Sequence, residues 1–348
     1  AAELESLIEE HPDVLDYRFA LATLAELTGD DERAMVILGS IIDKEIPIED
    51  MMAAYNKLAQ LYFSNGDFEE ARYLAYDVLE MDSSNTMRQQ PQSVRASLLL
   101  GKAHEINGSL ELAEDRYAAA YRFSKEEPKV GIIYAQFFLR HGELQRAERI
   151  LEKLSERHPE NADVLKLLAE IMLKKNDWIA ADDLAGKLRA LDATDSDAYQ
   201  ISGAALAGLQ NPEDSRLAYE KAYEITPDAG TAIKALVESY LLNGEIEKAR
   251  SFLSSVMEKS PNNYLAKTLL ARIEFQNNRT EAGEKLIREA IAGAPTEPSG
   301  YAMLARHYLE KGQVNKAEAI LKEGLEVTPD GFLLNITQAG LLESEGKI

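Results

Sequence analysis

Two arginines 34 residues apart, Arg272 and Arg306, have the type and spacing needed to bind a carboxylate from outside the chain. Neither has an acid four residues earlier, where the chain carries Thr268 and Ala302, so neither can form an i, i+4 ion pair with an acid at that position. If the chain repeats with this period, the two guanidinium groups occupy equivalent places in adjacent copies and one carboxylate could bridge them. The alternative is that both are solvated or paired with acids of neighbouring helices.

The other residue types that do chemistry form no recognisable site. The five histidines include neither a His-Glu-x-x-His pattern nor a pair at i, i+4, and cysteine is absent. No glycine-rich phosphate loop and no Gly-x-Ser-x-Gly turn occurs, and the acids are scattered over helix faces. We therefore expect no catalytic residue, no cofactor and no metal ion, and we expect that the chain is not an enzyme.

A small residue recurs every 34 residues and defines the elements that would carry the arginines. The series runs through Ala113, Ala147, Ala181, Ser215, Ala249, Gly283 and Ala317, and it extends back to Ala71 and Ala34 at spacings of 42 and 37. Each copy has two apolar stripes at helical spacing, as in residues 232–241 and 249–256. Such a period is typical of stacked helix hairpins, in which the small residue lets two helices approach closely.

A turn residue five positions before each small residue separates the two helices. Most copies use glycine or asparagine, which tolerate a positive φ, and the full series is Gly29, Gly66, Gly108, Gly142, Asn176, Gln210, Gly244, Asn278, Gly312 and Gly346. Gln210 is the exception, and the adjacent Asn211-Pro212 suggests that its turn is rebuilt. Prolines 17 residues after the turn can stop one hairpin and open the next, at Pro159, Pro227, Pro261, Pro295 and Pro329.

Local runs within the period indicate the kind of repeat. Two copies carry the clearest pattern: residues 55–62 with 65–71, read as YNKLAQLY and NGDFEEA, and residues 301–308, read as YAMLARHY, with Gly312, Ala317 and Pro329. With these runs the chain resembles the tetratricopeptide-repeat family. The resemblance implies an all-α fold, a right-handed α-solenoid of helix-turn-helix hairpins. Several copies depart from the motif at its first aromatic position, which holds Arg18, Ser97, Gly131, Leu165 or Ile233.

We expect one continuous array over residues 1–348. Nine full copies run at 15–48, 52–85, 94–127, 128–161, 162–195, 196–229, 230–263, 264–297 and 298–331. Residues 1–14 read as a lone second helix and 332–348 as a lone first helix, and neither end has a polar capping unit, so we expect a fragment of a longer array. Insertions lie near 46–51 and 83–93; the second predicts a loop, either a tolerated insertion or one that shapes a binding face.

In tetratricopeptide proteins the first helices line a concave groove that holds peptides of a partner. Mapping those inward positions onto this chain gives as contact residues Asn56, Gln60, Lys102, Gln136, Lys166, Glu170, Gln200, Lys234, Glu238, Arg272 and Arg306. Lys166 with Glu170, and Lys234 with Glu238, can instead neutralise each other as i, i+4 pairs. A chaperone-type carboxylate clamp is not expected, because the copies that follow Asn56 carry leucine and isoleucine at the required positions.

Composition limits the classes of partner. Sixty acidic and 38 basic residues give a net charge of −22, which repels phosphate backbones and anionic lipid surfaces, so we expect no nucleic acid ligand. No apolar run approaches the roughly 18 residues that cross a bilayer, so we expect no membrane span in this segment. We expect a monomer or weak dimer. The compartment stays open between the cytoplasm and a bacterial periplasm or envelope.

These features predict a non-catalytic scaffold that binds peptides or domains of protein partners in the groove. The array also resembles the repeat proteins of bacterial envelope assembly and exopolysaccharide export, which would place the scaffold in such a system. The alternative is a regulatory or substrate-recruiting arm of a larger enzyme, such as a glycosyltransferase.

Overall fold

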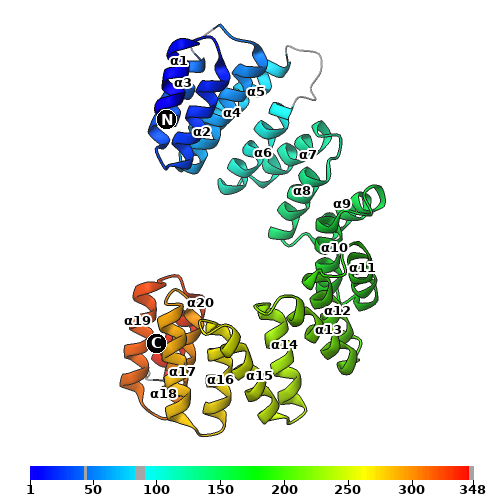
Figure 1. Cartoon of the computed structure of the whole chain (residues 1–348), viewed down its shortest axis with the longest axis vertical. Helices are drawn as coiled ribbons and strands as arrows, with labels where there is room; N and C mark the ends of the chain where they lie inside the picture. The colour runs from blue at the N-terminus through cyan, green and yellow to red at the C-terminus, as the bar shows by residue number, and fades with distance from the viewer. Residues whose placement is uncertain (43–44, 84–90, 345–348) are drawn as a thin grey trace. The chain divides into compact units, whose positions relative to one another are not determined.

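A computed structural model describes residues 1–42, 45–83 and 91–344, and this part of the chain forms 20 helices and no strand (Figure 1). The all-α solenoid expected from the sequence is confirmed. The chain divides into two compact units, Ala1–Leu168 and Ala169–Ile348, and the boundary falls inside helix α10 (Ala162–Lys174). The division into nine repeats with the bounds given above stays a prediction.

The helices of the first unit are short and follow one another closely. Before α10 they are α1 (Ala2–Glu10), α2 (Leu15–Leu27), α3 (Asp31–Ile42), α4 (Ile48–Ser64), α5 (Phe68–Ser83), α6 (Pro91–Ile106), α7 (Leu110–Phe123), α8 (Pro128–Arg140) and α9 (Leu144–Arg157). Four antiparallel hairpins result: α2 packs on α3, α4 on α5, α6 on α7 and α8 on α9. Each hairpin also contacts the next one, through α3 and α4, α5 and α6, and α7 and α8.

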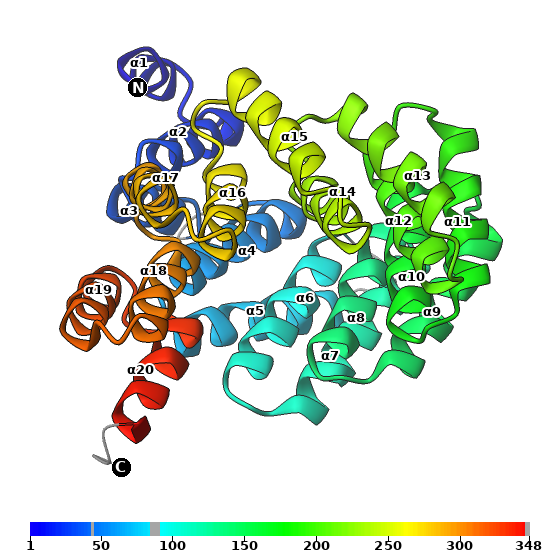
Figure 2. The same cartoon turned by 90° about the horizontal axis from the view of Figure 1, so that it is seen from below.

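The second unit repeats this arrangement with more uniform helices. After α10 they are α11 (Trp178–Leu191), α12 (Ser196–Gly208), α13 (Pro212–Ile225), α14 (Gly230–Leu242), α15 (Ile246–Lys259), α16 (Tyr264–Gln276), α17 (Thr280–Gly293), α18 (Pro298–Glu310), α19 (Val314–Val327) and α20 (Phe332–Ser344). The hairpins α12–α13, α14–α15, α16–α17 and α18–α19 follow one another in chain order (Figure 2). The first helices α14, α16, α18 and α20 also contact each other in that order.

The buried core of the second unit runs from hairpin to hairpin. A single cluster contains Tyr219 of α13, Ile233 of α14, Leu253 of α15 and Ile273 of α16, each less than a tenth exposed. A helix with one apolar stripe has to bury that stripe against another element, and here the neighbouring hairpin supplies it. Stacking therefore provides the burial that no single hairpin could provide alone.

The turns between paired helices are built as the sequence predicts. All nine turn positions among the described residues have φ between 59° and 88°, namely Gly29, Gly66, Gly108, Gly142, Asn176, Gln210, Gly244, Asn278 and Gly312. This left-handed conformation closes a helix C-terminus and reverses the chain within a few residues. The tenth position, Gly346, lies outside the described residues.

Gln210 corrects one expectation, because its turn is not rebuilt. Its φ of 59° matches that of Asn176 and Asn278. The amide of Gln210 donates to the carbonyl of Ala207, and the next amide, Asn211, donates to Leu206, which is the same pattern of spacing as at Gly244. Asn211-Pro212 instead starts α13, with the Asn211 side chain capping the helix. The stacked hairpins impose a left-handed residue that glutamine alone would rarely adopt.

The insertions are partly helical. Residues 43–44 and 84–90 lie outside the described residues, but Ile48–Asp50 form the first turn of α4 and Pro91–Ser93 the first turn of α6, where a loop was expected. Proline is favoured at the first position of a helix because its fixed φ suits the helix and no amide is lost. The hydroxyl of Ser93 is buried and donates to the carboxylate of Asp82 in α5, which ties this added turn to the preceding hairpin.

The periodic small residues lie where paired helices touch. Ala34, Ala71, Ala113, Ala147, Ala181, Ala249 and Ala317 have no exposed surface, and Ser215 and Gly283 are buried as well. The hydroxyl of Ser215 donates to the carbonyl of Gly203 at 2.7 Å, across its own hairpin. A larger side chain at these positions would have to push the two helices apart.

We therefore expect Ala147→Leu to lower the free energy of unfolding by about 1–3 kcal/mol through overpacking between α8 and α9. Far-UV circular dichroism during urea unfolding measures it. The control is Gln145→Leu on the exposed face of α9, for which a change within about 0.5 kcal/mol is expected. Equal effects of the two substitutions would show that position 147 has no special packing role.

Ion pairs add a second link between hairpins of the first unit. Glu105 of α6 accepts hydrogen bonds from Nε and Nη2 of Arg140 in α8, both at 2.8 Å, from the Tyr117 hydroxyl at 2.8 Å and from His141 at 3.0 Å. Burial would raise the pKa of Glu105, but these hydrogen bonds outweigh it and lower the pKa from 4.5 to about 2. The ionised carboxylate thus stabilises the contact between successive hairpins.

Because the pKa of Glu105 is lower in the folded chain, its contribution to stability is complete above about pH 4.5 and disappears as the pH falls towards about 2. We expect Glu105→Gln to lower the free energy of unfolding by about 2 kcal/mol at neutral pH, and this difference to shrink below about pH 4. Thermal melting at several pH values measures it. Glu152→Gln, at an exposed position of α9, is the control and should have no effect at any pH; a constant deficit for Glu105→Gln would contradict the linkage.

Candidate binding site

The contact residues predicted from the sequence lie on first helices but differ in exposure. Seven are exposed, namely Gln60, Lys102, Gln136, Glu170, Lys234, Glu238 and Arg306; Lys166, Gln200 and Arg272 are half-buried, and Asn56 is buried. No observation of the structure assigns these residues to a ligand. Their surroundings nevertheless separate those whose polar atoms are used within the fold from those whose polar atoms face outward.

Asn56 and Gln200 have their polar atoms occupied by neighbours. The amide nitrogen of Asn56 donates to the carbonyl and to the side-chain oxygen of Gln92 in α6, both at 3.0 Å. The amide of Gln200 lies 3.4 Å from a carboxylate oxygen of Asp197, one turn earlier in α12. These two side chains contribute to local structure, whereas the remaining residues in the row are the candidates for contact with another molecule.

Arg272 of α16 and Arg306 of α18 lie at one pocket of the second unit. The pocket has a volume of about 530 Å³, and its walls include Phe275 of α16, Met303 and His307 of α18, and Leu333 of α20. The helices α16, α18 and α20 are successive first helices in contact, so the 34-residue period places the two arginines at equivalent points of neighbouring helices. The period predicted this juxtaposition.

A glycine in the second helix shapes the aromatic wall of the pocket. A Cβ atom at Gly283 would lie 2.5 Å from the ring of Phe275, so only glycine leaves room for that ring between α16 and α17. The ring then stacks on His307 of the next first helix, with centroids 3.8 Å apart and planes inclined by 14°. The periodic small residue thus positions Phe275 in the wall of the pocket.

The polar atoms of the pocket are not all satisfied within the described chain. The Nε atoms of Arg272 and the Nε2 atom of His307 are buried without a hydrogen-bond partner. No carboxylate lies within 4 Å of the guanidinium group of Arg272 or of Arg306 among the described residues. By contrast Arg250, in the same unit, donates to the buried Glu274 at 2.8 Å. The two pocket arginines therefore differ from the paired arginines that surround them.

His307 is neutral at physiological pH. Its ring is 96% buried, since only 4% of the residue is exposed, and burial together with the charge of Lys311 lowers its pKa below the ordinary value. Glu284 and Glu310 oppose this shift without overcoming it. The positive charge of the pocket therefore comes from Arg272, Arg306 and Lys311, and Glu310 is the acid among the lining residues.

Sequence reasoning missed Phe275, His307, Met303 and Leu333. His307 was read as a structural or solvated histidine, and the three apolar residues fall within ordinary helical stripes. The replacement of alanine by glycine at position 283 was the available signal, because it predicts a large neighbour over that position.

The expected pairing of Lys234 with Glu238 is absent. Both side chains are exposed on α14, and no ion pair within 4 Å joins them in the described part of the chain. Exposed pairs of this kind are worth only a few tenths of a kcal/mol, so solvation competes with them effectively.

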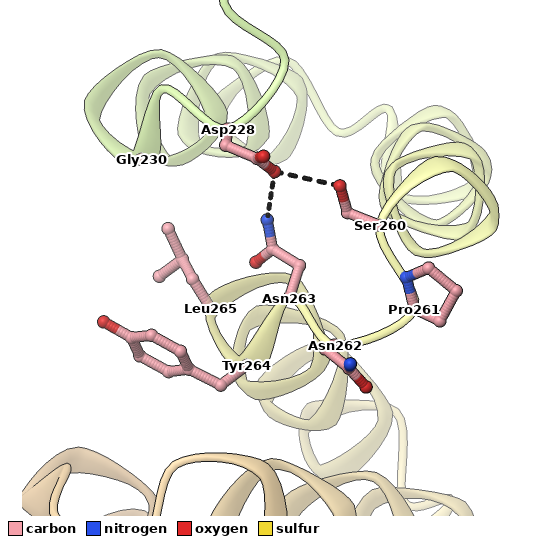
Figure 3. Close-up of a pocket in the computed structure, with 8 residues that line it drawn as sticks. All are labelled: Asp228, Gly230, Ser260, Pro261, Asn262, Asn263, Tyr264 and Leu265. Carbon is pink, nitrogen blue, oxygen red and sulfur yellow. Dashed lines mark hydrogen bonds between the residues drawn. The ribbon is translucent and has the colours of Figure 1, made fainter.

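A second hollow lies at the junction of α13, α14, α15 and α16 and is explained by the fold. Asp228 accepts hydrogen bonds from the Ser260 hydroxyl at 3.0 Å and from the Asn263 amide at 3.5 Å (Figure 3). These bonds hold together the two connections between hairpins, and Asn263 also caps α16 through its side-chain oxygen. The polar groups of this hollow serve one another.

Two further classes of site were searched in the described residues. No group of three or more His, Asp or Glu side chains there is arranged to hold a metal ion. Among the same residues, none of the helices combines the length and apolar character that crossing a bilayer would require.

Stacked hairpins, left-handed turns and a pocket on successive first helices define an α-solenoid repeat protein. Family models agree with this class: residues 51–81, 206–273 and 274–334 match tetratricopeptide-repeat models, and residues 84–199 match the TPR domain of cytochrome c-type biogenesis protein H. The chain is a tetratricopeptide-repeat protein. Such repeats serve in general as scaffolds for binding other proteins.

Curated relatives are similar over only part of their own length. Human antiviral effector IFIT1 is 34% identical over 37% of this chain and 28% of its own. Cellulose synthase operon protein C of Pseudomonas fluorescens is 25% identical over 58% of this chain and 16% of its own. Human tetratricopeptide repeat protein 21B is 21% identical over 93% of this chain and 29% of its own. The matched segments thus span less than a third of these relatives.

Solved structures support the fold. A tetratricopeptide-repeat protein from Parabacteroides merdae has a TM-score of 0.52 at 14% identity, covering 79% of this chain and 98% of that one. The C-terminal part of a TPR repeat-containing protein from Cytophaga hutchinsonii has a TM-score of 0.51 at 16% identity, covering 81% and 97%. At such low identity these structures show the fold alone.

Because no acid neutralises Arg272 and its Nε is buried without an acceptor, we expect Arg272→Met to leave the free energy of unfolding unchanged or to raise it by about 1 kcal/mol. The matched control is Arg250→Met, which strands the buried Glu274 and should lower it by about 3 kcal/mol. The fluorescence of Trp178, the single tryptophan, whose ring packs on Gly208, reports unfolding of this unit. A loss with Arg272→Met comparable to that with Arg250→Met would show that Arg272 has a structural partner.

Proposed function

We propose that the chain is a non-catalytic scaffold that holds a protein partner on the first helices of its second unit, with Arg272 and Arg306 as a contact point. The observation that carries the proposal is that two guanidinium groups without acid partners line one pocket of a chain whose net charge is −22. In such a chain an arginine has many acids available to it. An arginine kept away from all of them is available to a carboxylate of another molecule.

Catalysis has no support from the geometry of this pocket. The polar groups that line it are two arginines, a lysine, a neutral histidine, a glutamate, a serine and amides. No nucleophile hydrogen-bonded to a base occurs among them in the described hydrogen bonds, whereas acyl or phosphoryl transfer would need one. Binding is the activity that these groups can perform.

The proposed setting is a bacterial envelope or exopolysaccharide export system. Two similarities support it: the match of residues 84–199 to the TPR domain of a cytochrome c biogenesis protein, and the 25% identity with a cellulose synthase operon protein over 58% of this chain. The other relatives carry names from unrelated systems, so the setting rests on analogy. A glycosyltransferase domain in the same polypeptide would favour the enzyme-arm alternative.

Site-specific photo-crosslinking in the source cell tests the scaffold. A crosslinking amino acid at Gln276, an exposed residue that lines the pocket, should capture a protein identifiable by mass spectrometry. Arg272→Glu with Arg306→Glu should reduce this capture about tenfold or more, because each charge-assisted hydrogen bond contributes about 1.5–3 kcal/mol.

The control for that experiment is Lys187→Glu with Lys285→Glu, which makes the same change of charge at exposed positions of α11 and α17. This control should capture the partner as the unchanged chain does. Capture that survives reversal of both arginines, or that falls equally with the control, would contradict the proposed contact point.

A further inference from the structure

The pocket between α16, α18 and α20 combines two kinds of wall. On the polar side lie Arg272, Arg306 and Lys311, with one acid, Glu310, so that the local charge is +2. On the apolar side lie the stacked rings and Leu333, which remains 37% exposed. The local charge has the opposite sign to that of the chain as a whole, so the pocket can attract an anion that the rest of the surface repels.

Unused hydrogen-bonding atoms in the pocket point to a ligand with polar groups. The Nε2 atom of His307 is buried, has no partner and belongs to a residue that lines the pocket. The Nε atom of Arg272 is in the same condition. A buried polar atom without a partner costs about 1–3 kcal/mol, and a ligand that supplies an acceptor or donor recovers this energy.

The apolar wall is equally incomplete. The ring of Phe275 is packed between Gly283 and His307, which holds it in place, and the side chain of Met303 beside it is half-buried. Leu333 follows from α20 with more than a third of its surface free. A rigid aromatic floor with adaptable aliphatic neighbours suits a large apolar side chain, because burial contributes about 25 cal/mol per Å².

From these two walls we infer that the pocket takes a short peptide segment in which an aspartate or glutamate is adjacent to a large apolar residue. The carboxylate lies between Arg272 and Arg306, and the apolar side chain packs against Phe275, Met303 and Leu333. A volume of about 530 Å³ is within the range of ordinary ligand sites, about 300–1,000 Å³. This inference rests on the proposed function, that the second unit binds a protein partner, and specifies the chemistry of that partner.

A polyanion is a poorer fit than such a peptide. A nucleic acid would bring many phosphates against a chain of net charge −22, and only three cationic side chains line this pocket. An isolated carboxylate would satisfy the arginines and leave the apolar wall exposed. The combination of one acid and one apolar side chain satisfies both walls.

Selection from a displayed library of random peptides against the full 348-residue chain tests the inference. We expect the enriched peptides to share an aspartate or glutamate next to a phenylalanine, tyrosine, leucine or methionine. One enriched peptide, made synthetically, should bind Arg272→Gln with Arg306→Gln about tenfold or more weakly. Lys187→Gln with Lys285→Gln, which removes the same charge elsewhere in this unit, should bind it normally.

A second pair of measurements separates the two walls. Leu333→Ser, at a partly exposed position, should weaken the synthetic peptide several-fold while selections against it still enrich acids and lose the apolar neighbour. Succinate added in excess should compete weakly, because it lacks an apolar group; full competition by succinate would overturn the peptide inference in favour of a small carboxylate.

The outcomes distinguish the inference from the proposed function. Enrichment of peptides without an acid, or enrichment that is the same with and without the two arginines, would overturn the inference while leaving a peptide-binding scaffold. A selection that enriches no peptide above background would count against both. Circular dichroism of every variant confirms that it is folded before binding is compared.

Discussion

The whole structure depends on the close approach of two helices over one small side chain. A left-handed residue reverses the chain, and alanine, serine or glycine at the buried crossing lets the two helices touch. Each hairpin then has the same geometry and stacks on the next with the same offset. Because of that offset, residues 34 positions apart lie on neighbouring first helices, as Arg272 and Arg306 do. The site therefore follows from the packing rule, although neither arginine takes part in the packing.

Charge is used in two different ways along the chain. Glu105 with Arg140, and Glu274 with Arg250, place an acid of one hairpin against a base of another, and both carboxylates have little exposed surface. Such pairs hold neighbouring hairpins in register. The pocket arginines are separated from the many acids of the chain by the apolar side chains around them, which keeps their charge available. A chain with an excess of acids can keep a cationic site only if its geometry enforces this separation.

The period predicted the fold, the turn positions and the juxtaposition of Arg272 with Arg306, because these depend on spacing and residue type alone. Gln210 and the helical start at Pro91 were predicted wrongly, since neighbouring hairpins override local preference there. Lys125 and Glu126 also have positive φ without any sequence signal. The aromatic wall escaped prediction because Phe275 and His307 meet only through tertiary packing. Asn56 could not be recognised as internally bonded for the same reason.

Within each unit, the helices in substantial contact are one or two places apart in the chain. Loop-closure entropy is therefore small at every step, and contacts of this kind are associated with rapid folding. During synthesis an emerging hairpin can dock at once on the one before it, without waiting for a distant segment. The same locality means that a ribosome-bound intermediate exposes one unfinished apolar edge at a time, which limits the surface available for aggregation on the way to the completed chain.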